Sequence, residues 1–264
     1  MSLRIQNNVE AFNAHRNIVA TSSKLAKSME RLSSGYRINR AADDAAGLAI
    51  SEKLRAQIGG LAQGQRNAQD AVSLVQTAEG SLTEVHSMLQ RVRELAVQYQ
   101  NGTLSTNDKT AIASEVAQLT AEIERIGTTA QFNGIKLLDN TSSVTFQVGA
   151  NDTDDIATAM VSLGAQVGTI SLASASALAS IDDAISNVSS ARATFGAVQN
   201  RLEHTLNNLA AYQENLMASE SRIRDVDMAK EMVNFTKLQI LSQAGTSMLA
   251  QANQAPQGVL SLLR

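Results

Sequence analysis

The sequence predicts a mainly α-helical protein: a long antiparallel coiled-coil rod with a small β-hairpin and loop tip, and N- and C-terminal helices that pair into a separate coiled-coil domain. Three observations support this prediction. Apolar residues recur every seven positions in two long stretches, proline is absent before Pro256, and residues 149–170 are rich in Gly, Ala, Asp, Ser and Thr. A sustained heptad pattern indicates helices that cover one another, and the lack of proline permits long uninterrupted helices.

The rod is predicted from two matching heptad rows, one in residues 54–96 and one in 181–216. Each row has a second row of mostly small or apolar residues three positions later, so each helix presents one narrow apolar seam. The low aromatic content, 3%, is typical of thin helical bundles rather than a compact core. The residues expected to hold the rod seam are Leu54, Leu61, Val75, Leu82, Leu89, Phe195, Leu202, Leu209 and Leu216.

The two ends of the chain are each predicted to form a single amphipathic helix, over residues 4–33 and from about 226 to 253. The apolar residues of the first helix are expected on one side. Because a lone pair of helices buries little area, we expect these segments to gain order when many copies pack together. The expected subunit-assembly residues are Ile5, Val9, Phe12, Leu25, Leu32, Val226, Val233, Ile240 and Leu249.

Capping and breaking residues predict where the other helices begin and end. Asp43 or Asp44 starts a helix to about Gln100, and a third helix runs from Thr106 or Asn107 to Gly127. The second heptad helix runs from about 178 to 219, a shift of register predicts a joint near 219–227, and Pro256 should loosen the last residues.

The tip is predicted from short β-prone runs. Residues 135–138 and 144–148 flank the turn-rich segment 139–143 and predict a hairpin near 135–148. Residues 149–175 are expected to be a short exposed loop region with one more strand. The expected domains are therefore 1–42 plus 220–264, the inner terminal helical domain, and 43–219, the outer rod.

Composition and motifs argue against catalysis. The chain has no cysteine, and it lacks the zinc-protease, serine-hydrolase and phosphate-binding loop patterns. No catalytic residue, cofactor or metal is expected. No apolar run is long enough to span a membrane, and the basic residues near the N-terminus lack aromatic partners, so neither a membrane span nor nucleic-acid binding is expected.

Long strings of the sequence resemble the bacterial flagellin family. They are LSSGYRINRAADDAAGLAISEKLRAQIGGL at 32–61, QTAEGSLTEVHSMLQRVRELAVQ at 76–98, QFNGIKLL at 131–138, AVQNRLEHTLNNL at 197–209, and the whole of 220–264. The resemblance covers nearly all of the chain except about 149–175, where larger members of the family insert outer domains.

The resemblance implies a structural subunit that self-assembles into the hollow filament used for swimming, with the terminal helices in the filament core. It also implies unfolded export by the flagellar type III apparatus, a secreted, extracellular location, a flagellin-specific export chaperone bound at about 226–264, and contacts with flagellar cap and junction proteins. A patch sensed by a host Toll-like receptor matches Gln90, Arg91, Leu95 and Glu115. Two alternatives stay open: a hook–filament junction protein, and a secreted helical translocator or adhesin.

Overall fold

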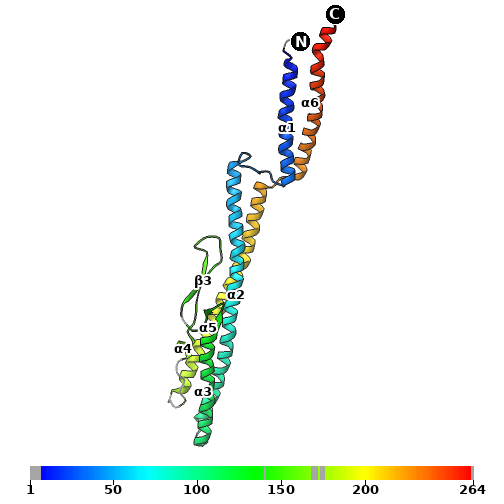
Figure 1. Cartoon of the computed structure of the whole chain (residues 1–264). Helices are drawn as coiled ribbons and strands as arrows, with labels where there is room; N and C mark the ends of the chain where they lie inside the picture. The colour runs from blue at the N-terminus through cyan, green and yellow to red at the C-terminus, as the bar shows by residue number, and fades with distance from the viewer. Residues whose placement is uncertain (1–6, 140, 168–171, 173–175, 263–264) are drawn as a thin grey trace. The chain divides into compact units, whose positions relative to one another are not determined.

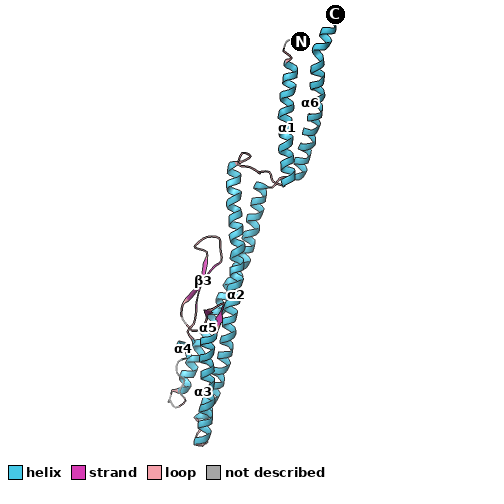
Figure 2. Ribbon diagram, viewed as in Figure 1, coloured by secondary structure: helices cyan, strands magenta, loops and turns pink. Residues whose placement is uncertain are grey.

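The protein is described by a computed structural model that covers residues 7–139, 141–167, 172 and 176–262. Within these residues the chain forms six helices and four strands (Figures 1 and 2). Their bounds are α1 (Val9–Ser34), α2 (Ala45–Tyr99), α3 (Thr106–Thr129), β1 (Gln131–Phe132), β2 (Ile135–Lys136), β3 (Ser143–Gln147), β4 (Asp155–Ala159), α4 (Leu163–Val167), α5 (Ala177–Arg224) and α6 (Met228–Leu262). The mainly helical fold expected from the heptads is confirmed.

The chain divides into two compact units. The first contains Met1–Ala56 and Leu216–Arg264, and the second contains Gln57–Asn215. In the first unit α1 and α6 run antiparallel side by side (Figure 1). In the second unit, α2, α3 and α5 form the helical rod, whose core includes Leu82, Leu89 and Phe195, each fully buried.

Local chemistry fixes the helix ends. Asn8 caps α1 by accepting a hydrogen bond from the Ala11 amide at 3.0 Å, and Gly35 ends the helix with a φ of 75°, the left-handed conformation that glycine adopts at low cost. The expected start of this helix at residue 4 is wrong for residues 7 and 8, which are not helical; residues 4–6 lie outside the described part. Asp44 caps α2 through the Gly47 amide at 2.9 Å, as expected.

Helix α3 also differs from the expectation at its end. Ser105 and Asp108 form a reciprocal capping box at its start. The helix continues to Thr129, past Gly127, which was expected to close it. Gly127 is instead a packing residue, because a Cβ atom there would lie 3.3 Å from the Leu163 side chain.

The predicted pairing of the tip strands is wrong. Strand β2 pairs with β1, and β3 pairs with β4, so two hairpins replace the single one expected near 135–148. The physical reason for the first is the Asn133–Gly134 turn, where φ values of 48° and 80° match a tight two-residue hairpin.

In the expected exposed loop at 149–175, residues 150–153 are exposed, but four of the described residues farther on are buried. The further strand is present as β4, and it turns Ile156 and Thr158 inward. Met160 and Leu163 are buried as well, and Leu163 begins the short helix α4. Ile156 and Thr158 are two residues apart, so alternation along the strand places both on its buried face.

The joint expected near 219–227 is present, although α5 extends to Arg224 before the break. Helix α6 then runs to Leu262, so the expected loosening at Pro256 is wrong. Proline has no amide hydrogen and leaves the carbonyl four residues earlier without its helical partner. That carbonyl belongs to Ala252, and it accepts a hydrogen bond from the Asn8 side-chain amide at 2.7 Å, which compensates for the missing donor.

Candidate assembly surfaces on the terminal helices

Helices α1 and α6, the terminal pair, meet along one face of each helix. On α1 this contact face includes Ile18, Leu25 and Ser28, and on α6 it follows a heptad through Glu231, Leu238, Gly245 and Ala252. Gly245 permits close approach, because a Cβ atom there would lie only 2.8 Å from Ile18 Cγ1. The pair therefore packs as a narrow coiled coil with small residues at the contact.

A polar cluster interrupts this contact near the end of α1. The Ser28 hydroxyl donates to Glu231 Oε1 at 2.5 Å, the Asn234 amide donates to the same oxygen at 3.2 Å, and Arg31 Nη1 lies 3.9 Å from Glu231 Oε2. Glu231 is 9% exposed. A buried carboxylate without these donors would be costly, so the cluster favours one register of α1 against α6.

Each helix of the terminal pair also carries apolar residues that its partner does not cover. At about 100° per residue, Val9, Phe12 and Val19 lie on the side of α1 opposite its contact face, and Val233 and Ile240 do so on α6. Leu241 and Met248 flank these two residues. We call these seven residues, including Leu241 and Met248, the outer face. Their exposed fractions range from 47% to 73%. A helix that is apolar on several sides is normally enclosed by further neighbours.

The sequence-predicted assembly residues therefore divide between two surfaces. Leu25, Leu32 and Leu249 are half-buried in the terminal pair, and Val226 is half-buried at the joint. Val9, Phe12, Val233 and Ile240 belong to the outer face. Ile5 lies outside the described residues. The expectation that the apolar residues of α1 share one side is wrong. They form two stripes on nearly opposite sides of the helix, the contact face and the outer face, and both stripes fit steps of three and four residues.

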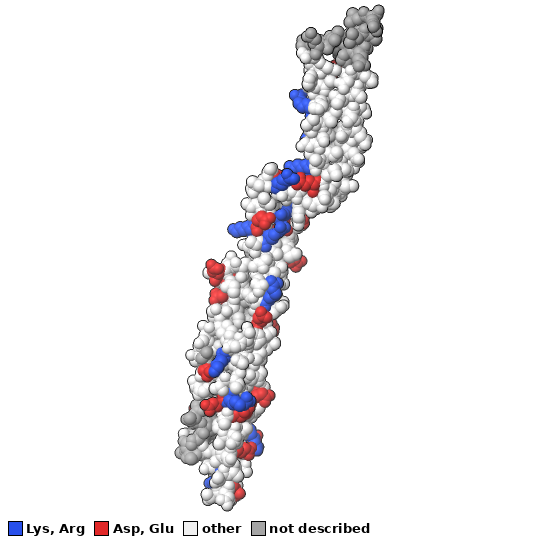
Figure 3. Space-filling view, in the orientation of Figure 1, with Lys and Arg blue, Asp and Glu red and all other residues white. Residues whose placement is uncertain are grey.

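A third stripe on α6 is polar but carries no charge. It contains exposed hydroxyl and amide side chains at helical spacing, and no charged residue occurs between Lys237 and Arg264. Its members are Thr236, Gln239, Gln243, Ser247 and Gln254. On the face in view in Figure 3, charged side chains are sparse over the terminal pair.

The joint connects the terminal pair to the start of α2 and the end of α5, all within the first unit. The Val226 amide donates to the Gly35 carbonyl at 3.0 Å, the Arg37 amide donates to the Arg224 carbonyl at 2.7 Å, and Tyr36 and Asp225 form a β-bridge. The two connecting segments therefore hold each other through backbone hydrogen bonds that do not depend on side-chain identity.

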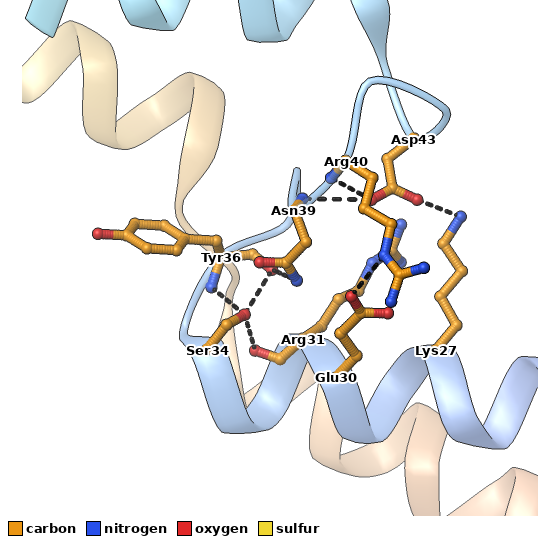
Figure 4. A network of polar contacts seen from close by, with 8 residues as sticks. All are labelled: Lys27, Glu30, Arg31, Ser34, Tyr36, Asn39, Arg40 and Asp43. Carbon is orange, nitrogen blue, oxygen red and sulfur yellow. Dashed lines mark hydrogen bonds and ion pairs between the residues drawn. The ribbon is translucent and has the colours of Figure 1, made fainter.

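Asp43 organises the polar side of this joint (Figure 4). Its carboxylate lies 2.6 Å from Lys27 Nζ and accepts hydrogen bonds from the amides of Asn39 and Arg40 at 3.2 and 3.1 Å. The bond from Lys27, aided by these amides, lowers the pKa of Asp43 to about 2. Arg40 in turn pairs with Glu30 at 3.0 Å. The carboxylate thus ties the link after α1 to the helix itself.

Seven of the nine residues predicted to hold the rod seam are buried: Leu61, Val75, Leu82, Leu89, Phe195, Leu202 and Leu209. Leu54 and Leu216 are only half-buried. They belong to the first unit, on the stretch where Arg55 pairs with Glu220 at 3.1 Å across α2 and α5.

The residues matched to the receptor patch come together on α2 and α3. Arg91 donates from Nε and Nη2 to Glu115 Oε1 at 3.1 and 3.0 Å, and Gln90 is exposed beside His86. The Glu115 hydrogen bond raises the pKa of Arg91. Leu95, at 2% exposed, belongs to the rod core beneath them. Three of the four residues are thus exposed and one is structural.

Sequence reasoning missed several residues that shape these surfaces. Asn8 and Glu231 look like ordinary surface residues in a helical pattern, and Gly245 looks like a weak point. The available signal was the presence of glycine within strongly helical segments, which indicates close approach of another backbone or side chain.

Within the described residues, no cluster of His, Cys, Asp or Glu could hold a metal ion, and no helix there combines the length and the hydropathy needed to cross a bilayer. Residues 5–143 match the bacterial flagellin N-terminal helical region, and residues 178–263 match the bacterial flagellin C-terminal helical region. The chain belongs to the bacterial flagellin family. It is a structural subunit of the flagellar filament.

Individual flagellins support this assignment. The chain is 55% identical to flagellin of Halalkalibacterium halodurans, over 98% of this chain and 99% of that protein, and 49% identical to flagellin of Bacillus subtilis, over 99% and 100%. The crystal structure of Bacillus cereus flagellin is 34% identical with a TM-score of 0.51, covering 55% of this chain and 88% of that one. A putative flagellar hook-associated protein of Vibrio parahaemolyticus, 16% identical with a TM-score of 0.59, covers 69% and 100% and shares the fold.

Proposed function

We propose that the subunit polymerises into a hollow tube in which the terminal helices, from residues 1–42 and 220–264, form the inner wall and residues 43–219 form the outer rod. The observation that carries this proposal is the outer face. Its apolar side chains are uncovered in the single chain, and they lie on both helices of the pair.

The geometry of the outer face favours an open polymer. The α1 part and the α6 part are different surfaces, so contact between them in two copies is heterologous, and a heterologous contact that does not close generates a helical filament. Burying one large apolar side chain contributes about 1.5–3 kcal/mol, so several such residues repeated at each contact can offset the cost of association.

The uncharged polar stripe of α6 suits the wall of a water-filled channel. Thr236, Gln239 and Gln243 offer hydroxyl and amide groups to water without attracting segments of either charge. An exported chain passing along such a wall would meet neither strong apolar nor strong ionic contacts. We assign this stripe to the inside of the tube.

Export and partners follow from the same surfaces. We infer that the subunit leaves the cell unfolded through the flagellar type III apparatus, and that a flagellin-specific chaperone covers residues 226–264 before export. The mature filament is extracellular, where its ends meet cap and junction proteins. A host Toll-like receptor can read the exposed Gln90, Arg91 and Glu115.

The two alternatives are weaker. The hook-associated neighbour is 16% identical and supports only a common fold, whereas several relatives at 43–48% identity are named flagellar filament core proteins. A junction protein caps a limited structure, so indefinite growth on seeds separates the two. A translocator would bind liposomes, and the filament subunit is expected not to.

The experiment compares elongation on sheared filament seeds for Phe12→Ser, Val233→Ser and a matched control, Val97→Ser. Val97 lies on α2 and is 51% exposed, so its replacement tests exposed apolar loss away from the outer face. We expect elongation of the first two variants to slow by about tenfold or more, because each loses roughly 1.5–3 kcal/mol of burial. Equal helicity by circular dichroism excludes misfolding. Growth of Phe12→Ser and Val233→Ser at the control rate would contradict the assembly role.

A further inference from the structure

Methionine is the only sulfur-containing residue of this chain, which has no cysteine and also no tryptophan. Two-electron oxidants such as hydrogen peroxide therefore meet thioethers as their principal target. Of the seven methionines in the part of the chain that the structure describes, five are about half exposed or more: Met29, Met217, Met228, Met232 and Met248. Met160 is 3% exposed and offers an internal reference.

Met248 differs from the others in its surroundings. It is the most exposed of the five at 65%, and it lies on the outer face of α6, one heptad after Leu241. No charged side chain lies within ten residues of it along the helix. An oxygen added to this sulfur would enter an apolar contact if the outer face packs against another subunit.

We propose that Met248 is an oxidation-sensitive modification site, at which peroxide converts a free subunit into a form that the growing filament excludes. The inference rests on the proposed assembly through the outer face. The thioether sulfur attacks one peroxide oxygen, the O–O bond breaks, an S–O bond forms, and the other oxygen leaves as water. One methionine and one hydrogen peroxide give one sulfoxide and one water, with the sulfur oxidised and the peroxide reduced.

The sulfoxide changes the packing chemistry of the outer face. It is a polar acceptor in place of an apolar sulfur. The outer face of a packed copy would offer it no side-chain donor, because its other members are Val9, Phe12, Val19, Val233, Ile240 and Leu241. Burying an acceptor without a donor is unfavourable, so incorporation slows. Within a filament the same sulfur is covered and protected, which restricts the modification to subunits that have not yet joined.

Two of the other exposed methionines serve as matched controls. Met232 lies on the line of the uncharged polar stripe, one turn before Thr236, where a sulfoxide stays hydrated. Met217 lies on α5 rather than on the terminal pair. Oxidation at these positions is expected to leave elongation nearly unchanged, although their exposure, 51% each, makes them comparably reactive.

The test treats wild-type, Met248→Leu, Met232→Leu and Met217→Leu subunits with graded hydrogen peroxide, removes the peroxide, and follows elongation on untreated seeds. Peptide mass spectrometry measures sulfoxide at each methionine. We expect oxidised wild type, Met232→Leu and Met217→Leu to elongate about tenfold slower, Met248→Leu to retain its rate, and a methionine sulfoxide reductase to restore wild type. Met160 should stay unoxidised.

A second measurement does not depend on any variant. Partly oxidised wild type is added to seeds, and the incorporated and remaining subunits are compared by mass spectrometry. Sulfoxide at residue 248 should be depleted among the incorporated subunits. Sulfoxide at residue 232 should be equally abundant in both pools. Equal sulfoxide at 248 in both pools, or normal growth of wild type fully oxidised there, overturns the inference while leaving assembly intact. Failure of untreated wild type to grow at all instead refutes the proposed function.

Discussion

The double role of Asn8 yields the sharpest prediction about the terminal pair. Its Oδ1 accepts from the Ala11 amide and caps α1, while its Nδ2 donates to the Ala252 carbonyl that Pro256 leaves without a helical donor. Replacing Asn8 by Ala removes both bonds. The loss of the cap costs about 1 kcal/mol, and the half-buried carbonyl adds roughly 1 kcal/mol more.

Asn8→Asp separates the two bonds, since a carboxylate keeps the capping acceptor and lacks the donor. We expect it to cost about 1 kcal/mol, near half the cost of Asn8→Ala. Pro256→Ala supplies an amide hydrogen to the Ala252 carbonyl, so in that background Asn8→Asp should cost little. The comparison is a double-mutant cycle with a coupling of roughly 1 kcal/mol.

Hydrogen exchange measured on peptides that cover residues 7–20 and 245–255 reports these costs where they arise. Tenfold faster exchange corresponds to about 1.4 kcal/mol of lost local stability. Peptides from the rod, such as those around Leu82, serve as the internal control and should not change. If Asn8→Asp costs the same with Pro256 and with Ala at that position, the proposed compensation between Asn8 and Pro256 is refuted.

Two further predictions concern the rod and the joint. Gly64→Ala should lower the urea unfolding free energy by about 1–3 kcal/mol, because the new Cβ would lie 2.5 Å from the Val148 carbonyl oxygen. Gly59→Ala on the same helix meets nothing within 4 Å and should raise that free energy by about 0.5–1 kcal/mol. Effects of the same sign would contradict the close approach of the segment after β3 to α2. Asp43→Asn tests the joint. The pKa of Asp43 is lowered from 3.8 to about 2 in the folded protein. The carboxylate therefore stabilises the fold at pH values above 3.8, and this contribution is lost as the pH falls through about 2. The urea midpoint of wild type should therefore fall more steeply between about pH 4 and 2 than that of Asp43→Asn, and parallel curves would refute the role of the Lys27 pair.

Heptad periodicity predicted the rod because it is a long-range repeat with one dominant cause. Leu82 and Phe195 recur in rows that can be buried only by another helix, and both are fully buried. Helix ends were predictable for a similar reason: Asp44 and Gly35 act on their own backbone within a few residues. Such local chemistry does not depend on the rest of the fold.

The tip was harder to predict because strand pairing depends on which of several possible turns forms the hairpin. Asn133–Gly134 forms a two-residue hairpin, and this leaves Ile135 paired with Phe132 rather than with the strand after residue 143. The partner of β3 lies beyond an intervening loop, in a segment whose few apolar residues gave no strong period. Burial of Ile156 and Thr158 comes from packing that the local sequence does not specify.

The terminal pair shows why spacing alone could not assign the assembly residues. Steps of three and four residues describe any helical stripe, so Leu25 on the contact face and Phe12 on the outer face fit the same pattern until a partner is placed. Glu231 resolves the ambiguity, because its carboxylate needs Ser28 and Asn234, which fixes the side of α6 that faces α1. Once that side is fixed, the apolar residues left outside must be covered by another copy or remain exposed to water.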